Sequence, residues 1–359
     1  MRLDQVHGHD RLKRILGRAL ERDRLPPSLL LAGPDGVGKK TLALAVGQAL
    51  LCEQAPVAEP CGGCRMCRRI ESGLHSLDDL RQRADRRPDE DTWRNFRVHP
   101  DLVLAEGWWL TRTGRPRPEP EIRVDQVRDL ISEIAGAPFE ARRRFFVIDD
   151  AHTMNEAAQN ALLKSLEEPA PRSHVVLVSS APLGLLHTIR SRCQLLRFGP
   201  LPRSVVAGLL HQRAGLAEDE ARLRAGLAGG SVGAALQLES EAYRDARERL
   251  LSLLESLDGM SPLDRMRAAQ DLEQSEAPAL LLTTLRSLLR DVAAARAGAD
   301  PASLVHADVA PRLTALALKP VAARASELAE RAAQARGAVR GFANRLLTFD
   351  VLVDALAGD

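Results

Sequence analysis

A glycine-rich segment, GPDGVGKK at residues 33–40, constrains the fold of this chain more than any other feature of its sequence. It fits the pattern G-x-x-x-x-G-K. The residues before it, SLLLAG, have the composition of a short buried strand, and the residues from about 39 to 51 are predicted to be helical. In such a strand-to-helix turn, backbone amides and the helix N-terminus surround phosphate oxygens. The segment therefore predicts a phosphate-binding loop in an α/β domain.

Strand and helix patterns alternate through the first 200 residues or so. Continuous apolar runs, typical of strands buried on both faces, lie at 103–106, 143–150 and 174–180. Segments with apolar residues at helical spacing alternate with these runs, which predicts a parallel sheet with helices on both faces. PRPEP at 116–120 is predicted to be a turn or linker. After about residue 200 the strand pattern ends, and the chain is predicted to be helical to Asp359.

The composition is that of a folded globular protein, with 45% hydrophobic and 27% charged residues in a chain of 359. This length favours two or three domains. The net charge of +2 and the aromatic content of 3% argue against a basic surface or a stacking platform for nucleic acid. The longest apolar stretches are about half the roughly 20 residues that a transmembrane helix needs. Because the charged N-terminus lacks the apolar core of a signal peptide, we expect a cytoplasmic protein without membrane contacts.

The glycine loop supplies candidate nucleotide-binding residues. Lys39 would reach the β and γ phosphates of a nucleotide. Lys40 stands where a Ser or Thr hydroxyl would coordinate Mg²⁺, and Thr41 is one residue late, about 100° around the helix. These residues leave open whether the loop binds ATP with Mg²⁺. The candidate residues of the loop are Gly33, Gly36, Gly38, Lys39, Lys40 and Thr41.

Two aspartates, Asp149 and Asp150, end the apolar run at 145–150. This is the form of a Walker B strand, in which the first acid contacts the metal shell and the second orients the attacking water. Asp150 is one methylene shorter than the usual glutamate, so a water held by it would be displaced by about an ångström or more. Efficient hydrolysis is therefore not expected. The alternative is that the two aspartates only cap a helix or end a strand.

Four of the five cysteines fall within residues 52–67, namely Cys52, Cys61, Cys64 and Cys67. In a cytosolic chain such a set more often holds a metal than disulfides. Four thiolates would form a closed, tetrahedral structural zinc site with Zn–S distances near 2.3 Å. Reduced thiols without a metal are the alternative. His75 and His99 are further ligands in principle but are more often ordinary histidines, and Cys193 is expected to pack against its neighbours.

Four features of the sequence are distinctive in combination: GPDGVGKK, the four cysteines after it, VIDDAHTMNEAAQNALLKSLEEPAP at 147–171 and LVSSAPLGLLHTIRSRC at 177–193. Taken together they resemble the AAA+ subunits of bacterial clamp loaders. The resemblance covers residues 1 to about 240. It implies an α/β P-loop AAA+ domain at 1–200 with a zinc module at 52–67, then a helical lid at 201–242 and a helical collar or oligomerisation domain at 243–359. Residues 76–98 depart from the family: their mixed charges and weak apolar periodicity predict an exposed insertion or partly ordered loop.

The resemblance also implies a role in DNA replication, within the DNA polymerase III holoenzyme. Such rings of five subunits use ATP to open a sliding clamp and place it on primed DNA. Arg192 of the SRC motif would enter a neighbour's ATP site as an arginine finger, a task that suits an always charged guanidinium. Ser179 or Ser180 would occupy the sensor position. The implied partners are gamma or tau and delta subunits in a hetero-pentamer, with the clamp and primed DNA reached through the complex. The alternative for Arg192 is an ordinary solvated arginine.

Three departures separate the chain from the ATPase members of this family. Those members carry Thr, Glu and a sensor arginine where this chain has Lys40, Asp150 and Gly233. The resemblance therefore implies a stator subunit with a degenerate ATP site, little or no ATPase of its own, and a finger for its neighbour. The alternative is a gamma- or tau-like subunit that hydrolyses ATP at Lys39 and Asp149. A third hypothesis, an unrelated zinc-containing DNA-binding protein, is disfavoured by the charge and aromatic content.

Overall fold

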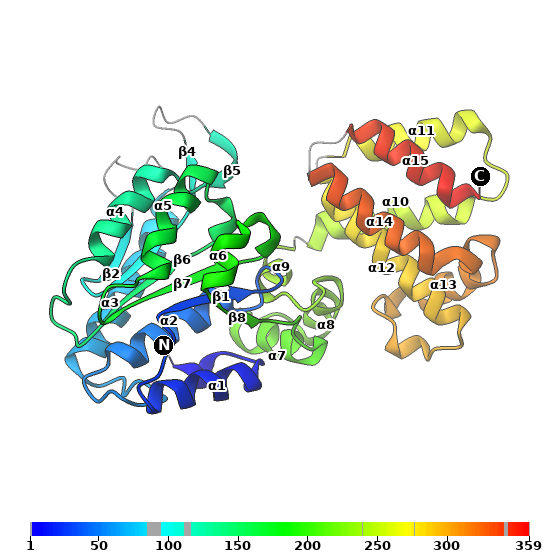
Figure 1. Cartoon of the computed structure of the whole chain (residues 1–359). Coiled ribbons are helices and arrows are strands. Elements are labelled where there is room, and N and C mark those ends of the chain that lie inside the picture. Colours follow the sequence, from blue (N-terminus) through cyan, green and yellow to red (C-terminus); the bar gives the residue numbers. More distant parts are fainter. Residues whose placement is uncertain are drawn as a thin grey trace. The chain divides into compact units, whose positions relative to one another are not determined.

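The structure is a computed structural model that describes residues 2–84, 95–110, 116–238, 240–275, 277–340 and 344–358. It divides into two compact units (Figure 1). The first unit consists of Met1–Val205 with Gly230–Gly233, and the second of Val206–Gly229 with Ala234–Asp359. Because this division does not separate a lid from the later helices, the organisation into three domains stays a prediction.

A six-stranded sheet forms the centre of the first unit, with the strand order β2-β3-β6-β7-β1-β8 (Figure 1). All neighbouring strands are parallel except β2 and β3, which are antiparallel. The carboxyl ends of the parallel strands therefore meet at one edge of the sheet, where ligands bind in open α/β folds. The strands are β1 (Ser28–Ala32), β2 (Phe96–His99), β3 (Leu102–Ala105), β6 (Arg144–Ile148), β7 (Ser173–Ser179) and β8 (Gln194–Arg197).

Helices cover both faces of this sheet, so β1, β3, β6 and β7 send alternate side chains into two separate cores. Phe145 and Val147 of β6 pack into the core that α1, α2 and α3 cover. Phe146 and Ile148 pack on the opposite face, under α4, α5 and α6. Burial of both faces explains the continuous apolar runs of the sequence and confirms the predicted α/β fold. The helices are α1 (Asp10–Glu21), α2 (Lys39–Leu51), α3 (Arg65–Ala84), α4 (Val124–Ile134), α5 (Glu156–Glu167) and α6 (His187–Arg192).

Two segments of the first unit differ from the sequence-based expectation. PRPEP at 116–120 is not a turn or linker but lies in β5 (Pro116–Glu121), which pairs antiparallel with β4 (Trp108–Leu110). Proline lacks an amide donor and is tolerated on edge strands, and both strands of a two-stranded sheet are edges. The expected insertion at 76–98 contains the end of α3 and the start of β2, and its residues 85–94 lie outside the described residues.

The second unit is helical throughout its described residues, which confirms the prediction for the chain beyond about residue 200. Its longest helix, α12, packs against α10, α13 and α14, while α11 packs against α15. Phe349, Val353 and Leu356 of α15 belong to the leucine-rich core of this unit. The C-terminal helices are α7 (Arg203–Ala214), α8 (Glu218–Leu227), α9 (Val232–Gln237), α10 (Ser240–Ser256), α11 (Pro262–Glu273), α12 (Pro278–Arg296), α13 (Ala310–Ala317), α14 (Ala325–Arg340) and α15 (Arg345–Ala357).

None of the helices, in the part of the chain that the structure describes, is long and apolar enough to cross a membrane.

Candidate nucleotide site and metal centre

The predicted phosphate-binding loop joins β1 to α2 at the carboxyl edge of the sheet. Gly36 and Gly38 have φ angles of 68° and 96°, a region of backbone conformation that favours glycine. A Cβ on Gly36 would also lie 2.3 Å from the Oγ of Ser231, so the position has no room for a side chain. The amide of Gly33 donates a hydrogen bond of 3.2 Å to the carbonyl of Ser179 on β7. The loop is therefore held against the neighbouring strand, with the N-terminus of α2 at the edge of the sheet.

Lys39, the first residue of α2, lies folded back onto the loop. Its Nζ donates hydrogen bonds to the carbonyl oxygens of Gly33, at 2.8 Å, and Pro34, at 2.6 Å. Burial lowers the pKa of this ammonium group, against the opposing effect of nearby aspartates. The side chain thus sits at the place from which the lysine of a phosphate-binding loop reaches phosphate oxygens.

Lys40 bridges two acidic residues at the ends of neighbouring strands. Its Nζ lies 2.6 Å from an Oε of Glu106, which follows β3, and 2.5 Å from an Oδ of Asp149, which follows β6. Sequence reasoning placed Lys40 and Asp149 in one site but missed Glu106. The signal was present, because Glu106 ends a predicted strand as Asp149 does, and parallel strands end at the same edge of a sheet.

The two aspartates after β6 differ in their surroundings. Asp149 is buried, and its amide donates to the carbonyl of Ala105 at 2.9 Å, which continues the pairing of β3 with β6. Asp150 has a φ of 45°, an uncommon conformation for a residue with a side chain. Burial, and then the negative charge of Asp149, raise the pKa of Asp150. Of the two aspartates, Asp149 is the one whose carboxylate forms the ion pair with Lys40.

The remaining predicted nucleotide-site residues lie around this edge. Ser179 is fully buried at the end of β7, and its Oγ forms no hydrogen bond. The Oγ of Ser180 lies 3.4 Å from the Nε2 of His152, a residue that sequence reasoning had not singled out. Thr41 is half-buried on the first turn of α2 and takes no part in the ion pairs of Lys40. That Thr41 does not replace the missing hydroxyl at position 40 stays a prediction.

Arg192 is the last residue of α6 and contacts none of the loop residues. Its guanidinium forms an ion pair with Glu167 of α5 and donates to the carbonyl of Thr188 at 3.0 Å. Its side chain is 33% exposed. The predicted finger thus lies apart from the nucleotide-site residues of its own chain and is held by one surface ion pair.

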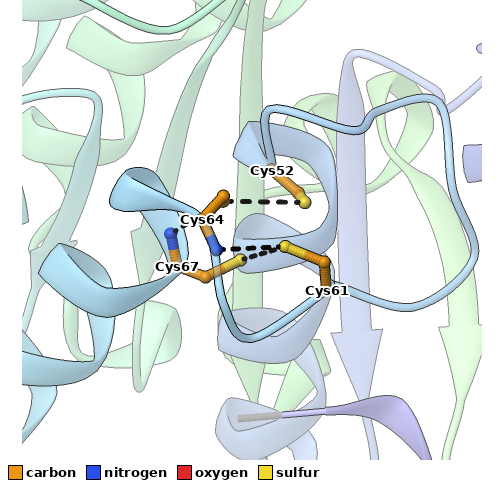
Figure 2. Close-up of side chains that lie close together, drawn as sticks. All are labelled: Cys52, Cys61, Cys64 and Cys67. Atoms are coloured by element: carbon orange, nitrogen blue, oxygen red, sulfur yellow. Dashed lines mark hydrogen bonds between the residues drawn. The ribbon is translucent and has the colours of Figure 1, made fainter.

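The four clustered cysteines come together as predicted (Figure 2). Their Sγ atoms all lie within 4.8 Å of one another. The Sγ atoms of Cys52 and Cys64 are 3.9 Å apart, and those of Cys61 and Cys67 are 4.0 Å apart. A tetrahedral zinc ion with Zn–S bonds near 2.3 Å requires S–S edges of about 3.8 Å. The four thiols therefore fit a tetrahedral metal ion.

The chain around these thiols also suits a thiolate cluster. Cys52 follows α2 directly, Cys67 lies on α3, and backbone amides of Cys64 and Cys67 donate to the sulfurs of Cys61 and Cys64, at 3.3 and 3.4 Å. Such amide donors stabilise negative sulfur and lower the pKa of the Cys61 thiol to about 7.

The other candidate ligands lie outside the cluster. His99 is buried, and its Nδ1 accepts the amide of Asp101 at 3.1 Å. His75 is exposed on α3. Cys193 is buried in the sheet core, and burial raises the pKa of its thiol to about 12.

Comparison with known proteins gives consistent matches. A family model described as "DNA polymerase III, delta subunit" matches residues 8–202. The chain is 31% identical over 248 residues to DNA polymerase III subunit delta' of Bacillus subtilis, covering 69% of this chain and 64% of that protein. It is 32% identical over 241 residues to subunit delta' of Pseudomonas aeruginosa, covering 65% and 63%. It is 27% identical over 313 residues to subunit tau of Bacillus subtilis, covering 85% and 48%. The chain thus spans less than two thirds of the length of these relatives.

Proposed function

The chain belongs to the DNA polymerase III delta-subunit family, and from this we propose that it acts in DNA replication as a subunit of the sliding-clamp loader. In this proposal it is a stator of the delta' type, which donates Arg192 as an arginine finger to the ATP site of a neighbouring subunit. Its partners are gamma or tau and delta subunits in a hetero-pentamer. The clamp and primed DNA are reached through the complex.

The placement of Arg192 is the observation that carries this proposal. An arginine that served its own chain's nucleotide would lie near Lys39 and Asp149, whereas Arg192 pairs with Glu167 on a different helix. Ion pairs at this degree of exposure contribute about 0–1 kcal/mol. The guanidinium can therefore leave Glu167 for a neighbour's phosphate oxygens at little cost, and two of its N–H groups suit that bidentate contact.

The edge of the sheet supports a low intrinsic ATPase activity. Lys40 occupies the position of the Mg²⁺-binding hydroxyl and pairs with Asp149. Asp150 is shorter than the glutamate that orients the attacking water, and its pKa is raised by burial. We expect the isolated chain to hydrolyse ATP at a rate no higher than a Lys39→Ala variant. Turnover that Lys39→Ala removes would favour a gamma- or tau-like ATPase instead.

The clustered cysteines support a structural role for zinc in this subunit. All four candidate ligands are thiols, which leave no coordination position open for substrate. The ligands lie at the end of α2, in the segment that follows it and on α3. A bound ion would therefore fix the segment between α2 and α3 against both helices.

Replacing Arg192 with alanine tests the finger in the assembled loader. We expect Arg192→Ala to leave the fold and assembly unchanged and to slow ATP turnover at the neighbouring site by about tenfold or more, because arginine fingers stabilise charge in the transition state. The measurement is clamp- and DNA-stimulated ATP hydrolysis by the loader reconstituted with its partner ATPase subunits.

The matched control is Arg22→Ala, which removes another exposed guanidinium from the same unit. This variant should hydrolyse ATP like the unmodified loader. Full turnover in an assembled loader that carries Arg192→Ala would refute the finger role.

A further inference from the structure

The ion pairs of Lys40 place a positive charge where a phosphate-binding loop usually holds a metal. We propose that the ammonium group of Lys40 takes the place of the divalent cation, so that this loop binds nucleoside polyphosphates in their Mg²⁺-free form. The inference rests on the proposed function only in treating residues 33–41 as a degenerate nucleotide site. It does not depend on Arg192 or on the partner subunits.

The ammonium group of Lys40 lies where Mg²⁺ would contact Asp149. Mg²⁺ needs oxygen ligands at 2.0–2.1 Å in a nearly octahedral arrangement. One Oδ of Asp149 already lies 2.5 Å from the Nζ of Lys40, and the hydroxyl that would complete the metal shell is absent at position 40. A divalent cation in contact with Asp149 would also face the positive charge of Lys40 at close range, where the two repel strongly.

The balance of charges at the carboxyl edge of the sheet also supports the replacement of the divalent cation by Lys40. Glu106 and Asp149 end neighbouring strands, and Lys40 pairs with both. A threonine at position 40 would remove the ammonium group that both carboxylates contact. That arrangement favours a divalent ion, because like charges at close range destabilise both ionised forms. The ammonium group of Lys40 thus provides the positive charge that a bound Mg²⁺ ion provides in other phosphate-binding loops.

The phosphate-binding side of the loop retains its donors. Lys39 lies directly beside Lys40, and a Cβ on Gly38 would meet no atom closer than 3.9 Å, so the backbone is open at that position. The amide of Gly36 donates to the carboxylate of Asp35 at 2.8 Å, so an anion is already held by this amide. Asp35 is exposed and free to swing outward when a phosphate oxygen replaces its carboxylate. Because nucleotide without Mg²⁺ carries more negative charge, the ammonium group of Lys39 attracts that form more strongly.

The test compares the affinity of the full chain for a fluorescent ATP analogue with and without Mg²⁺. The magnesium-free buffer is prepared over a chelating resin, because a soluble chelator would also strip the cysteine site. For the unmodified chain we expect saturable binding without Mg²⁺, and binding that is about threefold or more weaker in excess Mg²⁺. For Lys40→Thr we expect Mg²⁺ to have the opposite effect on the affinity, with binding of the ATP analogue about tenfold stronger in Mg²⁺ than without it. Lys40→Arg, which keeps the charge, should behave like the unmodified chain.

A direct probe of the cation is Mn²⁺, whose spin resonance signal reports binding without any nucleotide. Lys40→Thr should bind one additional Mn²⁺ per chain. The control Lys164→Thr, which removes an exposed lysine from α5, should bind none. Mg²⁺-strengthened binding by the unmodified chain, no saturable binding without Mg²⁺, or a folded Lys40→Thr that gains no Mn²⁺ would each overturn the inference. These readouts use the isolated chain, so they stay separate from the Arg192 test.

Discussion

The four clustered cysteine thiols have different surroundings, although they lie within one metal-sized space. Cys52 and Cys67 are buried, and burial raises the pKa of both thiols. Cys61 is exposed and accepts a backbone amide, which lowers its pKa. Buried thiolates without a counter-ion are unfavourable, whereas a bound divalent cation stabilises all four negative sulfurs at once. We therefore expect this segment to depend on a metal for its folding.

Elemental analysis of the purified chain should return about one zinc per chain. Cys64→Ser is expected to lose the metal and to lower the midpoint of thermal unfolding, because metal binding contributes folding free energy. Cys193→Ala is the matched control, since it removes a buried cysteine outside the cluster and should keep the metal. A folded chain purified without chelators that holds no metal would contradict the thiolate site.

Strand β6 shows how one element serves both packing and the candidate site. Its alternate residues fill two cores, and its carboxyl end delivers Asp149 to Lys40. Phe146 is fully buried, and the guanidinium of Arg144 lies over its ring, 5.1 Å from the centroid. Packing on both faces fixes the strand in place, so the position of Asp149 depends on side chains that never contact a ligand.

Phe146→Ala should lower the free energy of unfolding of the first unit by about 3–5 kcal/mol, because it removes a buried ring and leaves a cavity. The measurement is urea unfolding followed by tryptophan fluorescence, since Trp108 and Trp109 lie on β4 of the first unit. The control Phe139→Ala truncates a phenylalanine that is 79% exposed and should change the free energy by less than about 0.5 kcal/mol. Equal effects of the two substitutions would contradict the burial of Phe146.

For the molecule as a whole, buried and half-buried histidines set a dependence of stability on pH. Burial lowers the pKa of His9, His99 and His174 below the ordinary value of 6.5. His174 donates from Nδ1 to the carbonyl of Pro26 at 3.1 Å and accepts from Arg143 at Nε2, at 3.0 Å. Protonation of Nε2 would remove that acceptor and place two cations in contact.

The free energy of unfolding is therefore expected to fall as the pH drops below about 6.5. As the pH falls, the histidines of the unfolded chain take up protons before those of the folded chain, because their pKa is higher in the unfolded chain. The stabilisation that the neutral histidines provide is therefore complete above pH 6.5 and is lost on acidification. Urea unfolding at about pH 7.5 and about pH 5.5, with zinc in excess, measures the change. His174→Gln should show a smaller decrease than the unmodified chain. Stability that rises toward lower pH would be inconsistent with neutral buried histidines.

The sequence by itself determined the features that depend on short spacings. The glycine loop before α2, the apolar strands buried on two faces, the cluster of four cysteines and the helical C-terminal half all follow from neighbours a few residues apart. Periodicity and turn chemistry act locally, so these features are visible without the fold. The hairpin of β4 and β5 was missed because PRPEP has the composition of a turn, while pairing with a distant strand decided its structure.

Only the tertiary structure decided which charges meet. Lys40 and Asp149 are more than a hundred residues apart in sequence, and Glu106 joins them because β3 and β6 are parallel neighbours that end at the same edge. The pairing of Arg192 with Glu167 likewise depends on how α6 lies near α5. Such contacts are set by strand order and helix packing rather than by local pattern. Most of the charged residues at these sites could therefore be identified from the sequence, whereas their ion-pair partners depend on the tertiary structure.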